Sequence, residues 1–264
     1  MTSHVEFRST SMKAARKQQG ARAIPFAILF FATLHALDAH AGTTTGSLAI
    51  ASDDVFRGIS QTNRKPSLQG SLEYDAANGL YVGTWDGNVS WLSDQSTSQA
   101  RVSNSLEIDL YAGYRHKFGE KTTLDVGVLS YTYPGTYPGG FTHPDTTEAY
   151  AGVTYGVATL KASHSLSNLF GYARSKGSDY VEGAVNWEFT PGWTLNAHAG
   201  KQWIRHNRAY NYSDWRLGVT KAWKNGYSIA IAYAGTDADK TLYTNAHGNN
   251  IGGDTGVVTL SKSF

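Results

Sequence analysis

The sequence predicts an all-β protein, a single antiparallel up-and-down transmembrane β-barrel of about 12 strands. Three observations lead to this fold class. Polar and apolar residues alternate with a period of two from residue 45 onwards, connections are alternately short and long, and aromatic residues gather at one end of the strands. No amphipathic helix interrupts this pattern, and after the first forty residues no apolar run reaches the roughly 20 residues of a spanning helix.

The N-terminal segment has the composition of a cleaved signal peptide. Residues 8–22 are rich in Lys and Arg, and residues 23–34 form an apolar stretch of the right length. Ala39-His40-Ala41 then places small residues at the positions that signal peptidase reads. We therefore expect a signal peptide over residues 1–41 and a barrel over residues 42–264.

Removal of this leader changes the charge balance. The whole chain has 23 Lys and Arg against 21 Asp and Glu. The leader carries five bases and two acids, which leaves 18 bases against 19 acids in the processed chain. A chain so close to neutral offers no basic surface for nucleic acid, so no nucleic-acid partner is expected. An uncleaved anchoring helix is the alternative to a leader, and Met12 is the alternative start to Met1.

Twelve segments have strand composition or alternation. In chain order they are residues 45–51, 67–75, 80–88, 105–118, 122–133, 147–155, 158–165, 179–189, 193–203, 214–223, 227–235 and 255–264. Their ends are set by Gly, Pro and Asn in the short connections, at residues 76–79, 119–121, 156–157, 190–192 and 224–226. The intervening connections are long and rich in Ser, Thr, Asn and Gly. Short periplasmic turns that alternate with long external loops are typical of outer-membrane barrels.

The two faces of each strand predict which side chains line the lumen. Residues 227–235 set Tyr and Ile on one face against Ser and Ala on the other. The same parity assigns a set of charged side chains to the lumen: Glu73, Glu107, Asp109, Arg115, Lys117, Asp125, Glu148, Lys161, Glu182, Glu188 and Arg216. Acids outnumber bases in this set, which favours cations or neutral solutes over anions. The alternative is that these groups pair across the lumen and close it.

Aromatic residues on the apolar face cluster at the short-turn ends of the strands. They are Tyr74, Phe118, Tyr155, Phe189, Trp193, Trp223, Tyr227 and Phe264. Rings with an apolar body and a polar tip favour the membrane–water boundary, so we expect an aromatic belt there. A Phe at the end of the last strand is also the signal that outer-membrane barrels present to their assembly machinery, and Phe264 predicts that partner in addition to the lipid bilayer.

One region resembles a known family. The run from Leu48 to Gln61, Lys65-Pro66, residues 69–71 and the run from Gly79 to Trp85 are similar to the opening of the TorF-type porins of proteobacteria. The resemblance covers about residues 48–90. It implies an outer-membrane β-barrel in a Gram-negative cell and a channel, without an established substrate.

Two residues in the first long connection are candidates for the external mouth. Arg57 either forms a constriction with Asp53 or Asp54, or pins the first loop by an internal salt bridge. We favour the second interpretation. The aromatic-rich segment 133–144 either folds into the barrel as a gate or caps it from outside.

Enzymatic constellations are absent from the sequence. The chain has no Cys, and its loop histidines His143, His206 and His247 lack the spacing of a metal or catalytic motif. We therefore expect no catalytic, metal or cofactor-binding residues. The expected function is an outer-membrane porin-like channel for passive diffusion of small hydrophilic solutes, and the alternative is a non-conducting barrel whose external loops bind a partner or ligand.

Overall fold

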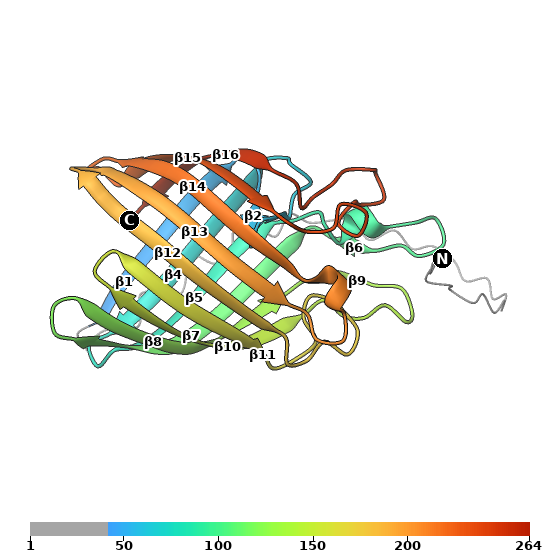
Figure 1. Ribbon diagram of the computed structural model, residues 1–264, viewed down its shortest axis with the longest axis horizontal. Coiled ribbons are helices and arrows are strands. Elements are labelled where there is room, and N and C mark those ends of the chain that lie inside the picture. Colours follow the sequence, from blue (N-terminus) through green and yellow to red (C-terminus); the bar gives the residue numbers. More distant parts are fainter. Residues whose placement is uncertain (1–41) are drawn as a thin grey trace, which may run out of the picture. The chain divides into compact units, whose positions relative to one another are not determined.

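The computed structural model describes residues 42–264, and twelve long strands in it close into one barrel (Figure 1). They are β1 (Gly42–Ala51), β4 (Ser67–Ala76), β5 (Leu80–Asn88), β7 (Leu106–Phe118), β8 (Thr122–Thr132), β10 (Thr146–Tyr155), β11 (Ala158–Ser165), β12 (Asp179–Thr190), β13 (Trp193–Trp203), β14 (Tyr212–Ala222), β15 (Tyr227–Thr236) and β16 (Thr255–Ser263). The predicted fold class is confirmed. The predicted signal peptide lies outside the described residues.

Every neighbouring pair of these strands is antiparallel, and β1 closes the ring by pairing with both β4 and β16. The predicted strands match the observed ones closely. β1 starts at Gly42, three residues before the expected position, because the backbone of Thr43 to Thr45 continues the ladder with β4 although the threonines show no polar–apolar alternation. β14 starts at Tyr212, two residues early, because Tyr212 pairs with Gln202 of β13.

Small elements lie in the long loops. They are the hairpin strands β2 (Val55–Phe56) and β3 (Ile59–Ser60), the paired strands β6 (Ser103–Asn104) and β9 (Gly135–Thr136), and two 3-10 helices, Ser93–Gln95 and Arg208–Tyr210. Within residues 42–264 no helix is long and apolar enough to cross a membrane. We call the end of the barrel that carries the long loops the outer end, and the opposite end the short-turn end.

The outward face is apolar. Leu68 and Ile231 are each 62% exposed, and Leu, Ile and Val recur at the outward positions of most strands. A continuous apolar surface of this kind is stable in lipid rather than in water. Seven of the eight predicted belt residues are exposed on this face, and Tyr74 is half-buried at an outward position of β4, in step with Leu68. Phe264, at 59% exposed, directly follows β16 at the short-turn end. A second, partial group of outward rings, Trp203, Trp215 and Tyr233, lies toward the outer end and was not predicted.

Buried side chains gather at the outer end. One cluster joins Val89, Leu92, Val102, Tyr131 and Tyr133, with rings from residues 137–141 packed against it. A second cluster joins Ile59, Tyr212, Ala238 and Tyr243. The segment 133–144 therefore packs against the loop that carries the first 3-10 helix, and β9 pairs with β6. The long loops form an organised layer across the outer end.

Candidate functional site

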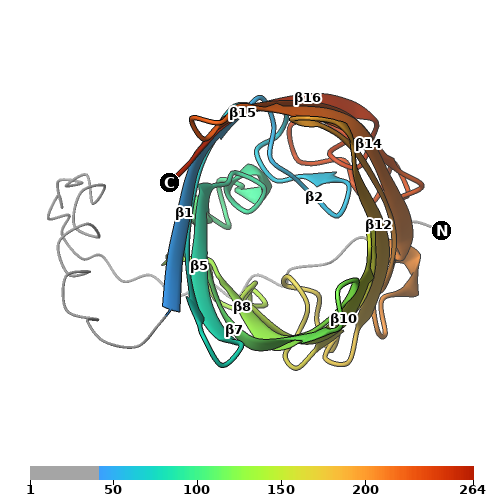
Figure 2. The same ribbon diagram turned by 90° about the vertical axis from the view of Figure 1, so that its left-hand side faces the viewer.

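The first long loop, residues 52–66, folds into the barrel. Figure 2, a view along the barrel, shows β2 inside the ring of strands, on the side of β12 and β14. β2 and β3 form a minimal hairpin whose two turn residues, Arg57 and Gly58, have φ values of 45° and 77°. Positive φ at both central positions is the geometry of the tight hairpin turn that matches strand twist, and Gly58 adopts it without strain. The turn presents the Arg57 side chain at the hairpin tip.

Arg57 clamps this hairpin to the barrel wall. Its guanidinium donates two hydrogen bonds to the Glu148 carboxylate of β10, at 3.0 and 2.7 Å, and one to Gln202 Oε1 of β13, at 2.9 Å. The group also lies 4.0 Å from the ring centroid of Tyr180 on β12. The Arg57 and Glu148 side chains are 7% and 2% exposed. A bidentate pair so well shielded from water fixes the hairpin in one position.

The alternative in which Arg57 forms a constriction with Asp53 or Asp54 is not what the structure contains. Asp53 instead accepts hydrogen bonds from Ser60 Oγ at 2.6 Å and Thr62 Oγ1 at 3.0 Å, so it braces the loop internally. Burial raises the pKa of Asp53. Burial, with the neighbouring charge of Asp53, raises the pKa of Asp54 to about 7. The favoured interpretation, an internal salt bridge from Arg57, agrees with this geometry, and its partner is Glu148.

Near the short-turn end, Arg115 of β7 forms a second charged group along the wall. It pairs with Glu73 at 2.6 Å, Asp75 at 2.9 Å and Asp125 at 3.3 Å. Its guanidinium also lies 3.8 Å from the Tyr81 ring centroid, and the Tyr81 hydroxyl is hydrogen bonded to Asp125. These partners come from β4 and β8, both close to β7 in the sheet. The pairing therefore runs along the wall rather than across the lumen.

The remaining predicted lumen residues lie in different surroundings. Glu107 and Asp109 are buried under the outer loops, and Glu107 accepts a hydrogen bond from the Tyr133 hydroxyl at 2.9 Å. The Lys161 ammonium lies 4.4 Å from the Tyr150 ring centroid. Glu182 lies 3.3 Å from His198. The structure thus does not bring the predicted residues into one site but spreads them over the wall, and their roles as pore-lining groups stay a prediction.

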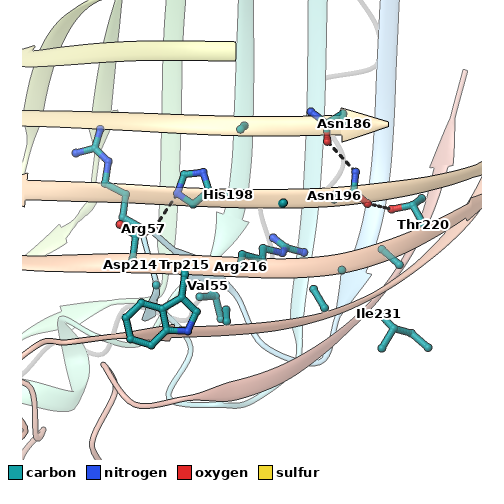
Figure 3. Close-up of a pocket in the computed structure, with 17 residues that line it drawn as sticks. Val55, Arg57, Asn186, Asn196, His198, Asp214, Trp215, Arg216, Thr220 and Ile231 are labelled. Carbon is teal, nitrogen blue, oxygen red and sulfur yellow. Dashed lines mark hydrogen bonds and ion pairs between the residues drawn. The ribbon is translucent and has the colours of Figure 1, made fainter. Parts of the chain in front are cut away.

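Below the hairpin, a cavity of about 380 Å³ lies against the wall formed by β12 to β15 (Figure 3). Arg57 and Val55 form part of its roof, while small side chains such as Ala230, Ala232 and Ala234 form one side. Small residues on this wall leave room inside the barrel. This cavity is the candidate functional site.

Two polar groups line this cavity. His198 Nε2 lies 2.8 Å from Asp214 Oδ1, and the Tyr180 hydroxyl donates to Asp214 Oδ2 at 2.9 Å. Farther toward the short-turn end, Thr220 Oγ1 donates to Asn196 Oδ1 at 2.7 Å, and Asn196 Nδ2 donates to Asn186 Oδ1 at 2.8 Å. We call this second set the amide ladder. Arg216 lies between the two groups.

Two of the predicted site residues, Arg57 and Arg216, line this cavity. Four other residues around the cavity were not predicted as site residues: Tyr180, His198, Gln202 and Asp214. All four occupy inward positions of predicted strands, and Tyr180 and Asp214 lie at or next to the strand ends. Parity alone identifies an inward side chain, but it does not say which inward side chains meet an infolded loop. Among the described residues, no group of three or more His, Cys, Asp or Glu side chains has an arrangement that holds a metal ion.

Solved structures with similar folds are porins and channels. The KdgM porin is 7% identical, with a TM-score of 0.52, and the match covers 83% of this chain and 99% of that one. The NanC porin is 10% identical, with a TM-score of 0.51 and coverage of 84% and 99%. An outer membrane channel from Pseudomonas putida F1 is 12% identical, with a TM-score of 0.50 and coverage of 86% and 98%. At these identities the similarity establishes the barrel fold.

At the level of sequence, the chain matches one family model. No curated protein matches the chain. The expected membership of the TorF-type porins is not confirmed by a match. The family model, described as a bacterial protein of unknown function, matches residues 36–264. The chain belongs to this family, Gcw_chp.

Proposed function

We propose that the protein is an outer-membrane channel for passive diffusion of small hydrophilic solutes. The observation that carries the proposal is the two-faced wall, whose outward side is apolar while charged and amide side chains face the lumen. The cavity below the Arg57 hairpin adds water-accessible volume inside the barrel. The porin fold of the structural neighbours supports the same function and an outer-membrane location in a Gram-negative cell.

The lumen charges suggest a mild preference for cations and neutral solutes. Glu73, Asp75 and Asp125 share the single positive charge of Arg115, which leaves a local excess of carboxylates near the short-turn end. A lumen with this balance raises the local concentration of cations. The reversal potential in a salt gradient measures this preference.

Phe264 is proposed as the contact with the assembly machinery. Its side chain is outward and exposed at the end of β16, and its backbone exchanges hydrogen bonds with Gly46 of β1, at 2.9 and 3.0 Å. The last residue therefore lies at the seam where the first and last strands close the barrel. Deletion of Phe264 is expected to slow insertion into membranes without changing the conductance of the barrels that do insert.

A second candidate is a non-conducting barrel whose loops bind a partner. The packed aromatic cluster at the outer end favours this candidate, because Tyr131, Tyr133 and their neighbours leave an ordered loop layer above the lumen. Such a layer is a stable recognition surface as well as a lid.

Planar-bilayer recording of the processed chain, residues 42–264, distinguishes the two candidates. The channel predicts discrete conductance steps that scale with salt concentration. A matched recording with the same chain, unfolded by heat before it is added to the bilayer, controls for leakage. A correctly folded barrel that inserts and passes no current contradicts the channel and supports the binding candidate.

A further inference from the structure

Arg216 differs from the other arginines of the barrel interior. Arg57 is paired with Glu148, and Arg115 is paired with three carboxylates. For the half-buried guanidinium of Arg216, the part of the chain that the structure describes offers neither an ion pair, a hydrogen bond nor an aromatic ring in contact. A guanidinium has five N–H donors in a rigid planar fork that fits a carboxylate. Arg216 thus directs unused donors into the cavity.

The acid nearest to Arg216 along the strand is already engaged. Asp214 is buried, and its two carboxylate oxygens are taken by His198 and the Tyr180 hydroxyl. Glu148 is held by Arg57 above the cavity. Within residues 42–264, Asp214 is the only carboxylate that lines the cavity, and it is therefore not free to neutralise Arg216.

The amide ladder supplies a second unused donor. Each link of the ladder uses an amide oxygen as acceptor, first Asn196 Oδ1 and then Asn186 Oδ1. Within residues 42–264 the Nδ2 group at the end of the ladder, on Asn186, has no hydrogen-bond acceptor. Figure 3 shows the Arg216 side chain extending along the wall from the His198 side toward the ladder. An ionic donor and a neutral donor thus line one cavity.

We propose that this cavity is a binding subsite for a small polyhydroxylated carboxylic acid. Arg216 binds the carboxylate, and the amide ladder binds hydroxyl groups. The cavity of about 380 Å³ has a size within the range of small-ligand pockets, roughly 300–1,000 Å³. The small side chains of β15 exclude water from one side of the bound acid, which strengthens the charged hydrogen bonds. The site is local, so it is compatible with a carboxylate excess elsewhere in the lumen.

This inference rests on the proposed function and names a class of ligand for the channel. Its first test measures binding and does not depend on conductance. Glucuronate and glucose are suitable probes, because they share a ring and differ in one carboxylate. Isothermal titration of the processed chain in detergent is expected to give tighter binding of glucuronate than of glucose, by about tenfold or more, the scale of a charge-assisted bidentate contact. Arg216→Gln is expected to remove that difference.

Lys161→Gln is the matched control. It also removes one positive charge from an inward position, but Lys161 lies over the Tyr150 ring and does not line the cavity. This variant is expected to keep the preference for glucuronate. Arg216→Lys keeps the charge without the planar fork and is expected to bind glucuronate with intermediate affinity. If both Arg216 variants form the folded barrel, a loss of binding in Arg216→Gln reflects the site rather than the barrel.

The outcomes separate the subsite from the channel. Equal affinity for the two sugars, or equal losses in Arg216→Gln and Lys161→Gln, overturns the subsite. A preference that depends on Arg216 supports it, even if bilayer recordings detect no conductance and the channel is rejected. Where the channel conducts, glucuronate should reduce the current in the wild type and in Lys161→Gln but not in Arg216→Gln, and block that is equal in all three overturns the subsite.

Discussion

The two ends of the lumen use similar side chains in different ways. At the outer end, the Arg57–Glu148 pair is shielded from water and joins a loop to the wall across 91 residues of sequence. At the short-turn end, Arg115 and its three carboxylates are about one-fifth to two-fifths exposed and join neighbouring parts of the wall to one another. Aromatic clusters surround the first pair, whereas the second faces the lumen.

Ion pairs therefore have two different roles in this barrel. A buried pair is worth little as net stability, but removing one partner leaves an uncompensated charge, so the pair fixes a unique arrangement. An exposed group is weakly stabilising and mainly shapes the local potential. In the proposed channel, we therefore expect the outer pair to set the width of the passage and the inner group to set the electrostatic potential that a solute meets.

The largest expected effect comes from breaking the outer pair. Arg57→Gln leaves Glu148 buried without its charge partner, at an expected penalty of about 3–5 kcal/mol to the docked loop. The hairpin should leave the wall, and single-channel conductance should rise severalfold. Arg115→Gln is the control at the other end and should shift the reversal potential while conductance changes little. If the two variants had the same effect on conductance, the assignment of separate roles would be wrong.

A smaller effect is expected from filling a close approach in the wall near the short-turn end. A Cβ at Gly113 would meet both the Tyr81 side chain and the backbone oxygen of Val126, so Gly113→Ala forces one of them to move. Overpacking of this kind costs about 1–3 kcal/mol. Thermal unfolding followed by heat-modifiable gel mobility should show a lower midpoint. Gly152→Ala, where the nearest atom lies at an ordinary 3.4 Å, should leave the midpoint unchanged.

The effect of pH on the stability of the docked outer loop should be smaller than the effects of Arg57→Gln and Gly113→Ala. Because burial raises the pKa of Asp54 from 3.8 to about 7, the docked loop favours the neutral acid. The loop is therefore most stable below pH 4 and loses stability as pH rises through 7. Current fluctuations should be more frequent at pH 8 than at pH 5, and Asp54→Asn should weaken that dependence. Fluctuations that rise toward acid pH would have the opposite sign and would exclude Asp54 as the cause.

The wall could be predicted from the sequence, whereas the contents of the lumen could not. Period-two alternation and Gly-containing turns located the strands to within a few residues, and the same parity placed Arg216 and Glu148 on the inward face. Loops have no such period. Nothing local in residues 52–66 indicates that Arg57 pairs with Glu148, because that contact depends on the shape of the closed barrel. The contacts of His198 and Asp214 follow from register between strands, which composition does not specify.

The central claim is that adjacent residues of one strand face lipid and water in turn. Since the chain has no Cys, single cysteines can be introduced at Ile229 and Ala230 of β15 and labelled in proteoliposomes with a membrane-impermeant maleimide. Ala230 lines the cavity, whereas Ile229 pairs with the exposed Leu260 on the outward face. We expect Ala230→Cys to react and Ile229→Cys to be protected by lipid. Equal reaction at both positions would contradict it.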